Sequence, residues 1–340
     1  MGRAFILVNR RARGGAASSL WSAVKPLCEA ALEGLDCRST VTVELDETSR
    51  WREELRAALG CGTRTFVAAG GDGTVGALVN ELAEHVPPAH LPSLRLGAVG
   101  LGSSNDLHKP AGTRDPVPLR LSLPALPRDL CTADYRAAAT GERGRRRFLV
   151  SASLGLLAEG NARFNTPGAM PARLKRWSVP LAIGWAGAAA LLSHRPRRLS
   201  LRPWSSAATF ASRGEPGAWG ERDEPGEGLL VDSLSVLKTP YLTGGLRCEL
   251  PVEFADGRLH VAAFVHEGRW SAVRTVRALS HGVAGRHCRY LATERLAVAG
   301  ERPFDLECDG ELVGGLEEVH FSVGTYRIGV LENAAEEGRS

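Results

Sequence analysis

Lysine is scarce in this sequence. Only four of its 340 residues are lysines: Lys25, Lys109, Lys175 and Lys238. Arginine supplies nearly all of the positive charge, and the formal net charge of +4 is too small to indicate nucleic-acid binding. No G-x-x-x-x-G-K-[ST] sequence is present, so a Walker A phosphate loop is excluded. Chemistry that requires a lysine has few candidates in this chain.

The usual cysteine and histidine patterns of metal sites are also missing. Seven cysteines are an odd number and form no C-x-x-C pair, which argues against a disulfide framework and a zinc site. The nine histidines include no H-E-x-x-H spacing. The longest apolar stretch, Val179 to Ser193, is shorter than the roughly 20 residues of a spanning helix, and the N-terminal apolar run is too short for a signal peptide. We therefore expect a cytoplasmic protein.

The first third of the chain alternates between two hydrophobic periods. Hydrophobic residues make up 44% of the chain and charged residues 24%, as in folded globular proteins. Short apolar runs predict strands over residues 4–8, 41–45, 64–69 and 95–99, and amphipathic spacing predicts helices over 18–32, 52–59 and from about 75. Pro26 is expected to kink the first helix or to mark its true first turn. This order predicts an open parallel α/β sheet.

The pattern changes after about residue 115. Short alternating runs over residues 147–151, 229–237, 258–265, 290–298 and 318–323 are separated by turn residues and predict an antiparallel β-sandwich. One helical segment, 172–193, and one polar surface loop, 213–228, interrupt them. The predicted fold class is α/β followed by β. We expect an α/β domain over 1–117, a β-sandwich domain over 118–325, and a tail over 326–340 that can return to the first domain.

A glycine-rich turn follows the third strand, with the sequence A-G-G-D-G-T at residues 69–74. Its glycines let backbone N–H groups approach an anion at the start of a helix. The carboxylate of Asp72 would repel a bare phosphate, so the turn indicates a nucleotide bound together with a divalent cation. Gly71, Gly73 and Gly76 also fit G-x-G-x-x-G, but a dinucleotide fingerprint belongs after the first strand and needs an acidic residue about 20 positions further on, which is missing. A turn without any ligand is the simplest alternative for one loop alone.

Two more polar loops are expected at the same edge of the sheet. The fourth strand is followed by G-L-G-S-S-N-D at residues 100–106, and the first by N-R-R-A-R-G-G at residues 9–15. Open α/β sheets bind ligands at the carboxyl ends of their strands, and three coincident loops make a ligand-free turn a poor explanation. Far along the chain, Asp309-Gly310-Glu311 reads by itself as a common turn.

These motifs, G-G-D-G-T, then G-x-G-S-S-N-D, then a late D-G-E, together resemble the diacylglycerol kinase catalytic family, which includes bacterial soluble lipid kinases, sphingosine kinases and ceramide kinases. The likeness runs from about Phe5 to Val330. The resemblance implies a nucleotide-binding α/β domain joined to a β-sandwich domain, with ATP and Mg²⁺ bound in the cleft between them. It also implies that Asp309 is the general base, and that Glu311, Asp72 and Asp106 organise Mg²⁺ through water. The residues it assigns to the nucleotide are Asn9, Arg10, Arg11, Thr48, Gly70, Gly71, Asp72, Gly73, Thr74, Gly102, Ser103, Asn105 and Asp106.

The segment D-G-R-L at residues 256–259 resembles the family's D-G-x-L-D, whose aspartate and neighbouring carbonyl groups hold a structural Mg²⁺ in some bacterial members. Here the resemblance implies Asp256 with carbonyl groups of Glu253 and Arg258. The sequence departs from the family pattern at three positions: Arg10 and Gly100 stand where the family has proline, and His260 stands where it has the final aspartate.

The segment 172–193 is where we expect lipid contact. Basic residues flank its apolar run, with Arg173, Lys175 and Arg176 before it and His194, Arg195, Arg197 and Arg198 after it. Such a segment can lie in a membrane interface, and it can equally be a core helix with solvated basic ends. The expected partner is a lipid substrate at a membrane surface, which would place the protein peripherally at the inner membrane surface; no nucleic acid is expected, and a homodimer stays open.

Three functions remain open from the sequence. The first is an ATP-dependent lipid kinase that acts on a hydroxyl group of diacylglycerol, a ceramide or a sphingoid base. The second is phosphorylation of a soluble dinucleotide by an NAD kinase-like enzyme, which has no use for a basic and apolar segment. The third is a non-catalytic nucleotide- or lipid-binding protein of the same fold. Retention of all four carboxylates, those of Asp72, Asp106, Asp309 and Glu311, argues against the third.

Overall fold

The chain folds into two compact units. Unit 1 contains Met1–Arg128 and Thr325–Ser340, and unit 2 contains Asp129–Gly324. Residues 118–128, which we assigned to the second domain, therefore belong to unit 1, because the first part of strand β5 (Leu119–Ala137) pairs with the sheet of that unit. The computed structural model describes residues 2–46, 48–109, 117–166, 170, 174, 178–204, 209–210, 228–242, 245–285 and 287–333.

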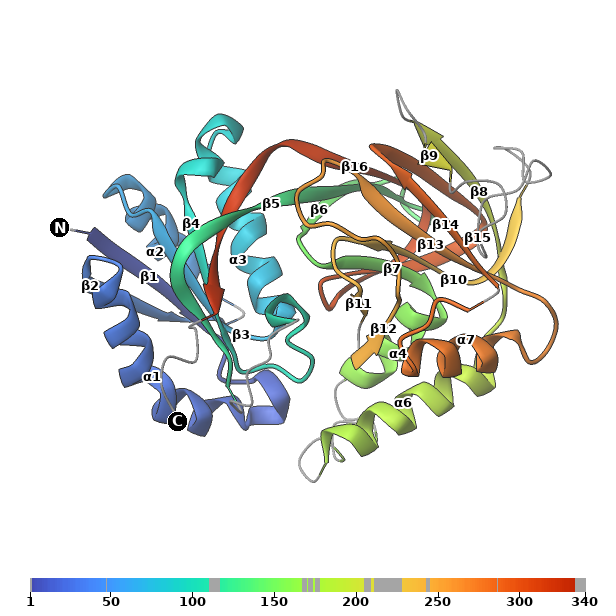
Figure 1. Cartoon of the computed structure of the whole chain (residues 1–340), viewed down its shortest axis with the longest axis horizontal. Helices are drawn as coiled ribbons and strands as arrows, with labels where there is room; N and C mark the ends of the chain where they lie inside the picture. Colours follow the sequence, from blue (N-terminus) through green and yellow to red (C-terminus); the bar gives the residue numbers. More distant parts are fainter. Residues whose placement is uncertain are drawn as a thin grey trace. The chain divides into compact units, whose positions relative to one another are not determined.

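Unit 1 is built on parallel strands in the order β2-β1-β3-β4 (Figure 1). Residues 98–99 of β4 pair with β5 in the antiparallel direction. Near Val330, the end of β16 pairs with β4 in the parallel direction. The strands are β1 (Gly2–Val8), β2 (Cys37–Glu44), β3 (Thr65–Gly70), β4 (Arg95–Gly100) and β16 (Glu311–Asn333); the helices are α1 (Ala17–Gly34), α2 (Arg50–Gly60) and α3 (Asp72–His85), with 3-10 turns at Ala12–Gly15, Pro88–Ser93 and Asp106–His108.

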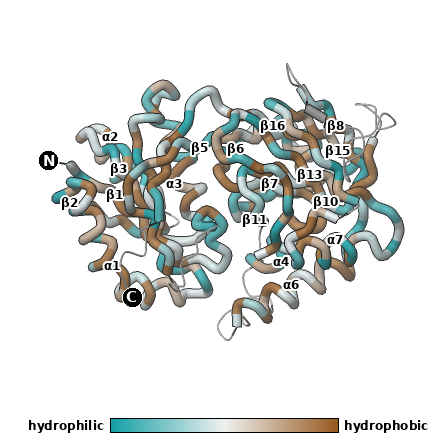
Figure 2. The backbone as a smooth tube through the Cα atoms, viewed as in Figure 1, coloured by the Kyte–Doolittle hydropathy of each residue, from teal (hydrophilic) through white to brown (hydrophobic). Residues whose placement is uncertain are grey.

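Burial explains why β1 and β3 read as continuous apolar runs. Residues 4–8 of β1 are at most 1% exposed, so side chains on both faces of the strand are covered. Figure 2 shows these central strands mostly in the hydrophobic colour. On one face, Ile6 and Val67 share a core cluster with Trp21 and Leu32 of α1. Helix α1 continues through Pro26, so that proline does not mark the first turn of the helix.

Unit 2 consists mainly of antiparallel strands. They run in the order β16-β15-β7-β10-β13-β14-β9, and β8 pairs with both β10 and β15, so they form one hydrogen-bonded network. Phe148 and Phe321 meet edge to face in their common core. The strands are β6 (Arg143–Phe148), β7 (Ser151–Gly155), β8 (Arg197–Trp204), β9 (Thr209–Phe210), β10 (Leu229–Leu237), β11 (Tyr241–Leu242), β12 (Leu246–Arg247), β13 (Leu259–Val265), β14 (Cys288–Thr293) and β15 (Arg295–Cys308); the helices are α4 (Leu156–Asn165), α6 (Val179–Ser193) and α7 (Ser271–Ser280).

Several expectations for unit 2 need correction. Helices α4 and α7 add to the single helix that was predicted, and each has only ten residues, too few for a clear period; tertiary packing stabilises such short helices. The run 147–151 is not one strand, because its middle residues donate their N–H groups to a side chain far along the sequence, as described below. The segment 290–298 is divided between β14 and β15. Positions 171–173, 175–177 and 213–227 lie outside the described residues.

Candidate functional site

Three loops of unit 1 meet at the carboxyl ends of β1, β3 and β4. The side chain of Asn9 donates from Nδ2 to Thr74 Oγ1 at 3.2 Å, which joins the first loop to the start of α3. The N–H of Leu101 donates to the carbonyl oxygen of Gly70 at 2.8 Å, which joins the third and fourth strands just where they end. The residues that the motifs placed in three separate loops thus share one edge of the sheet.

Glycine is required where two of these loops touch. A Cβ atom added to Gly102 would lie 2.4 Å from the Cα of Gly71, and one added to Gly70 would lie 2.1 Å from Thr74 Oγ1. Helix α3 begins immediately after Gly71, and the first N–H groups of a helix have no partner within the helix. Bare backbone beside the positive end of a 14-residue helix is a suitable cradle for phosphate oxygens. The loops therefore fit a nucleotide phosphate.

Asp72 connects the two glycine loops through its carboxylate. Its Oδ2 accepts the N–H of Asp106 at 3.0 Å, and its Oδ1 accepts the N–H of Leu107 at 3.0 Å. These are the first residues of the 3-10 turn Asp106–His108, so Asp72 caps that turn from another element. The carboxylate that we expected beside magnesium thus also holds the fourth-strand loop against α3.

The side chain of Asp106 is paired inside its own loop. Its Oδ1 lies 2.7 Å from Lys109 Nζ, and its Oδ2 accepts from Ser104 Oγ at 2.6 Å. Sequence reasoning missed Lys109, although one of only four lysines standing three residues after the motif was an available signal. Lys109 places a positive charge beside the phosphate cradle without a Walker A motif. Ser103 in the same loop is half-buried.

Asn105 shapes the loop backbone. It is one of the few non-glycine residues with a positive φ, at 53°, a conformation that asparagine tolerates better than most residues. Its Oδ1 accepts the N–H of Gly102 at 2.9 Å, and its Nδ2 donates to the carbonyl oxygen of Gly100 at 3.1 Å. Asn105 therefore maintains the turn that brings Gly102 against α3.

The remaining predicted nucleotide residues lie on the rim of this edge. Arg10 and Arg11 are exposed directly after β1, and Arg10 Nε is 3.8 Å from Glu44 Oε2. Thr48 lies between β2 and α2, and its hydroxyl donates to Asp46 Oδ1 at 2.7 Å. The arginines are well placed to attract an anion, whereas the Thr48 hydroxyl is already engaged with a carboxylate.

In unit 2, Asp309 and Gly310 form the tight turn between β15 and β16. Asp309 is only 4% exposed and has a φ of 46°. Its carboxylate accepts three backbone N–H groups from the link between β6 and β7: Leu149 at 2.8 Å, and Val150 and Ser151 at 3.0 Å each. The turn thus fixes the orientation of the predicted general base, while Glu311 is exposed.

Sequence reasoning missed two polar side chains that support this turn. Glu307, at 1% exposure, accepts the N–H of Gly310, and Asn161 of α4 donates from Nδ2 to the carbonyl oxygen of Gly310 at 3.2 Å. Glu307 stands two residues before Asp309, so an acidic residue beside the motif was an available signal, whereas no local motif marks Asn161, which is far from the turn in sequence.

The position predicted for a structural metal holds a lysine side chain instead. The Nζ of Lys238 lies 2.8 Å from Asp256 Oδ1, 2.8 Å from the carbonyl oxygen of Arg258 and 2.9 Å from Asp129 Oδ2. Among the residues described in either unit, no group of three histidine, cysteine, aspartate or glutamate side chains could hold a metal ion. These residues do not fit a bound Mg²⁺ because an ammonium group already contacts the oxygen atoms that would ligate it. The expected role of Asp256, Glu253 and Arg258 as metal ligands is corrected accordingly.

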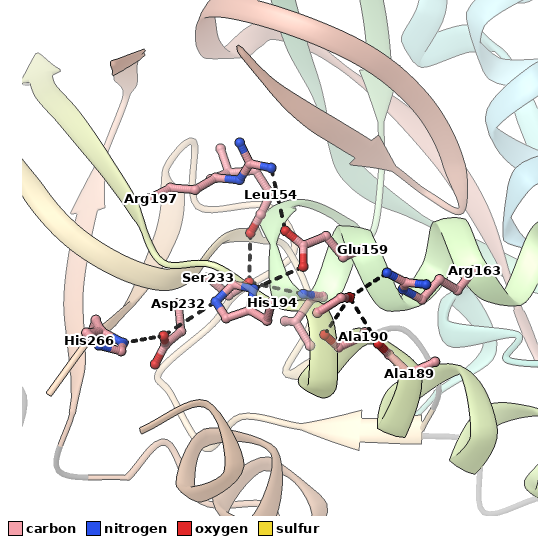
Figure 3. Close-up of polar contacts among 12 residues, drawn as sticks. Leu154, Glu159, Arg163, Ala189, Ala190, His194, Arg197, Asp232, Ser233 and His266 are labelled. Atoms are coloured by element: carbon pink, nitrogen blue, oxygen red, sulfur yellow. Dashed lines mark hydrogen bonds and ion pairs between the residues drawn. The ribbon is translucent and has the colours of Figure 1, made fainter. Parts of the chain in front are cut away.

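A second charged cluster lies where α6 ends, around His194 (Figure 3). Its Nδ1 is 3.0 Å from Glu159 Oε2 of α4, and its Nε2 is 3.4 Å from Asp232 Oδ1 of β10. Asp232 also accepts from Ser271 Oγ at the start of α7 and lies 2.7 Å from His266 Nδ1. Burial by itself lowers the pKa of His194, but Asp232 and Glu159 outweigh it and raise the pKa to about 9.

Helix α6 has an apolar surface on its outer side. Ala182, Ala186 and Ala190 form the buried stripe, and α6 packs on α4. Leu181 is 62% exposed, and Leu192 is 90% exposed. Within the described parts of the chain, no helix is long and apolar enough to span a membrane. The predicted solvated basic end is only partly observed, because the His194 side chain is 2% exposed.

Comparison with known proteins adds a family assignment. The diacylglycerol kinase catalytic domain model matches residues 3–125. Among solved structures, the chain is similar to a candidate diacylglycerol kinase from Bacillus anthracis str. Sterne, with a TM-score of 0.61 and 15% identity over 98% of this chain and 96% of that one. Another structure from the same organism, of a diacylglycerol kinase, has a TM-score of 0.55 and 13% sequence identity, over 98% of this chain and 97% of that one. Yeast NADH kinase complexed with NADH has a TM-score of 0.45 and 11% sequence identity, over 98% of this chain and 84% of that one. A similarity at this level supports no inference about function.

None of the curated proteins matches this sequence. The solved structures are all less than 25% identical to the chain and therefore establish a shared fold only. The match over residues 3–125 covers the glycine loops of unit 1 and ends before the D-G-E turn of unit 2. The family resemblance read from the motifs is confirmed over residues 3–125, which match the diacylglycerol kinase catalytic domain model.

Proposed function

We propose that the protein is an ATP- and Mg²⁺-dependent lipid kinase that transfers the γ-phosphoryl group to a hydroxyl of diacylglycerol, a ceramide or a sphingoid base. The observation that carries the proposal is the junction in unit 1, where the loops after β1, β3 and β4 present bare glycine backbone at the start of α3. A family match over the same residues supports it.

Phosphate binding in this proposal belongs to the loop backbone. Gly70, Gly71 and Gly73 leave room for phosphate oxygens against the first N–H groups of α3. Mg²⁺, when bound with ATP, neutralises phosphate charge as the phosphoryl group is transferred. Asp72 and Asp106 would orient water around it through the carboxylate lone pairs that the loop hydrogen bonds do not use. Lys109 and the exposed Arg10 and Arg11 add positive charge around the cradle.

Asp309 acts as the general base in this proposal. Phosphoryl transfer needs a group that accepts the hydroxyl proton as the oxygen bonds to phosphorus. Three backbone N–H groups hold the Asp309 carboxylate in one orientation, which suits a group that must meet a substrate at a fixed angle. The exposed Glu311 would assist with the metal through water.

The outer side of α6 is proposed to contact the lipid surface. Leu181 and Leu192 are exposed on a helix without a charged residue, and half-exposed Trp185 is a residue type that favours membrane interfaces. Figure 2 shows this helix largely in white and brown. The partner would be a lipid substrate at the cytoplasmic membrane surface, with peripheral attachment and a homodimer left open; no nucleic acid is proposed.

The activity test combines labelled ATP with a panel of lipids and NAD. Product in the organic phase supports the lipid kinase, product in the aqueous phase supports the NAD kinase-like alternative, and no product with any acceptor would favour a non-catalytic protein. Omission of Mg²⁺ should abolish the lipid product.

Membrane contact is tested separately by vesicle flotation. Leu192→Glu should reduce flotation with anionic vesicles. Leu27→Glu, on an exposed position of α1 that is 60% accessible, is the matched control and should float like the unaltered protein. Equal loss in both variants would remove α6 from the proposal.

A further inference from the structure

Lys238 is a completely buried lysine with three oxygen partners. It is 0% exposed, and its Nζ contacts Asp129 Oδ2, Asp256 Oδ1 and the carbonyl oxygen of Arg258 at 2.8 to 2.9 Å. An ammonium group has three N–H donors and no acceptor. Each donor of Lys238 therefore has one oxygen to bind, and the three come from two parts of unit 2: Asp129 from β5, and Asp256 and Arg258 from the loop before β13.

The oxygen atoms around Lys238 require a positive charge. Asp129 is 1% exposed, and the carboxylates of Asp129 and Asp256 both approach Lys238 Nζ. Without the positive charge on that nitrogen, the two carboxylates would repel each other. Other groups that face them include the N–H groups of Gly257 and Arg258 and the ring of His260, whose Nε2 is 3.0 Å from Asp256 Oδ2. The ammonium is thus the charge that balances this cluster.

Two carboxylate oxygens and a carbonyl oxygen are also ligands that suit a hard divalent cation. We propose that the ammonium of Lys238 is a built-in replacement for a structural Mg²⁺ in unit 2, and that its removal would turn the same oxygen atoms into a divalent-cation site. The inference does not depend on the proposed function. It means that this unit needs no metal ion for its own stability, whatever metal accompanies a nucleotide.

The cluster also adjoins the segment that holds Asp309. The N–H of Lys238 donates to the carbonyl oxygen of Val150 at 2.9 Å, and the N–H of Val150 donates to Asp309 Oδ1 at 3.0 Å. The backbone of residue 238 is therefore joined to the segment that holds Asp309, a contact that substitution of the lysine side chain leaves in place. The ammonium group itself joins β5 to the loop before β13.

The experiment compares Lys238→Ala with Lys238→Met, without nucleotide, in EDTA and in excess MgCl₂ or CaCl₂. Thermal unfolding of the unaltered protein should be the same in all solutions. Lys238→Ala should melt roughly 5–15 °C lower in EDTA and regain much of the loss with metal, because the short side chain leaves room for an ion. Lys238→Met should melt lower without recovery, because its side chain fills that room. Lys25→Ala, at an exposed position of α1, is the control and should not change.

Metal analysis locates the ion and covers a variant that fails to fold. One equivalent of metal should appear in Lys238→Ala and disappear when Asp256→Asn is added. The proposal is overturned if the unaltered protein binds a nucleotide-independent metal ion and melts lower in EDTA, a measurement that needs no variant. It is also overturned if folded Lys238→Ala neither loses stability nor binds metal.

Discussion

The His194 cluster predicts a stability that depends on pH in the alkaline range. His194→Gln removes the titrating ring while keeping a side chain that can hydrogen-bond to Glu159 and Asp232. In the folded protein the pKa of His194 is raised from 6.5 to about 9 by these two carboxylates. The contribution to stability is therefore fully present below about pH 6.5 and is lost as the pH rises through about 9.

The size of the effect follows from the pKa shift and the geometry. A shift from 6.5 to about 9 would correspond to about 3 kcal/mol. The contact of 3.4 Å between Nε2 and Asp232 is long for a hydrogen bond. Nε2 therefore forms an ion pair with Asp232 without a hydrogen bond. Because the separation of 3.4 Å weakens the pair between His194 and Asp232, we expect a contribution of about 2 kcal/mol.

Urea unfolding across this pH range, followed by circular dichroism, measures the difference between the unaltered protein and His194→Gln. The difference should be largest below neutral pH and should vanish above about pH 9. Hydrogen exchange of peptides from α6 and β10 assigns the change to unit 2. The exposed His90→Gln is the control and should follow the unaltered protein. A difference that stays constant from neutral to alkaline pH would refute the titration of His194 as its cause.

Three further predictions concern the glycine loops and the acidic turn. Gly102→Ala should abolish ATP binding in a binding assay, because its Cβ would lie 2.4 Å from the Cα of Gly71, whereas Gly184→Ala, which has open space, should bind normally; equal binding would show that the loops can separate freely. Asp72→Ala should cost about 2–4 kcal/mol in urea unfolding, since it leaves two N–H groups without their acceptor; a cost near zero would mean that water replaces the carboxylate. Asp309→Asn should lower turnover roughly 10²-fold or more while ATP binding persists, and unchanged turnover would remove Asp309 from the mechanism.

Acid should destabilise unit 1 through His108. Burial, and next the charge of Arg120, lower the pKa of His108 to about 3. The unfolded chain takes up a proton near pH 6.5 and the folded chain does not, so stability falls as the pH drops from about 6.5 towards 3. His108→Gln should flatten this part of the stability profile in urea unfolding, and an unchanged slope would contradict the assignment.

Local patterns were sufficient for most of unit 1. Its parallel strands are buried on both faces and so leave long apolar runs, and the glycines, Asn105 and Asp106 follow strand ends directly in sequence. The sequence patterns did not predict contacts between a side chain and a second partner that is distant in the chain. Asp72 was expected beside a metal ion, and no local pattern indicated that it also caps a turn 34 and 35 residues away.

Unit 2 shows the limit most clearly at Asp309 and Lys238. The D-G-E turn could be found from three letters, but its partners lie 158 to 160 residues earlier in the chain. Lys238 was noted only as one of four lysines, and the site that it fills was assigned to magnesium. Asp129 of β5 and the loop before β13 both reach Lys238 at the end of β10, although β5 and β10 are not neighbours in the sheet, so no local pattern predicts the contact.

The amino-acid sequence alone determined which segments form the loops at the carboxyl ends of β1, β3 and β4 and which family model residues 3–125 match, because strand burial, glycine turns and motif spacing are local properties. Only the tertiary structure decided which cation balances Asp129 and Asp256, what holds the carboxylate of Asp309, and how His194 becomes charged. Each of those outcomes depends on distances between residues far apart in the chain, and burial then sets how strongly their charges interact.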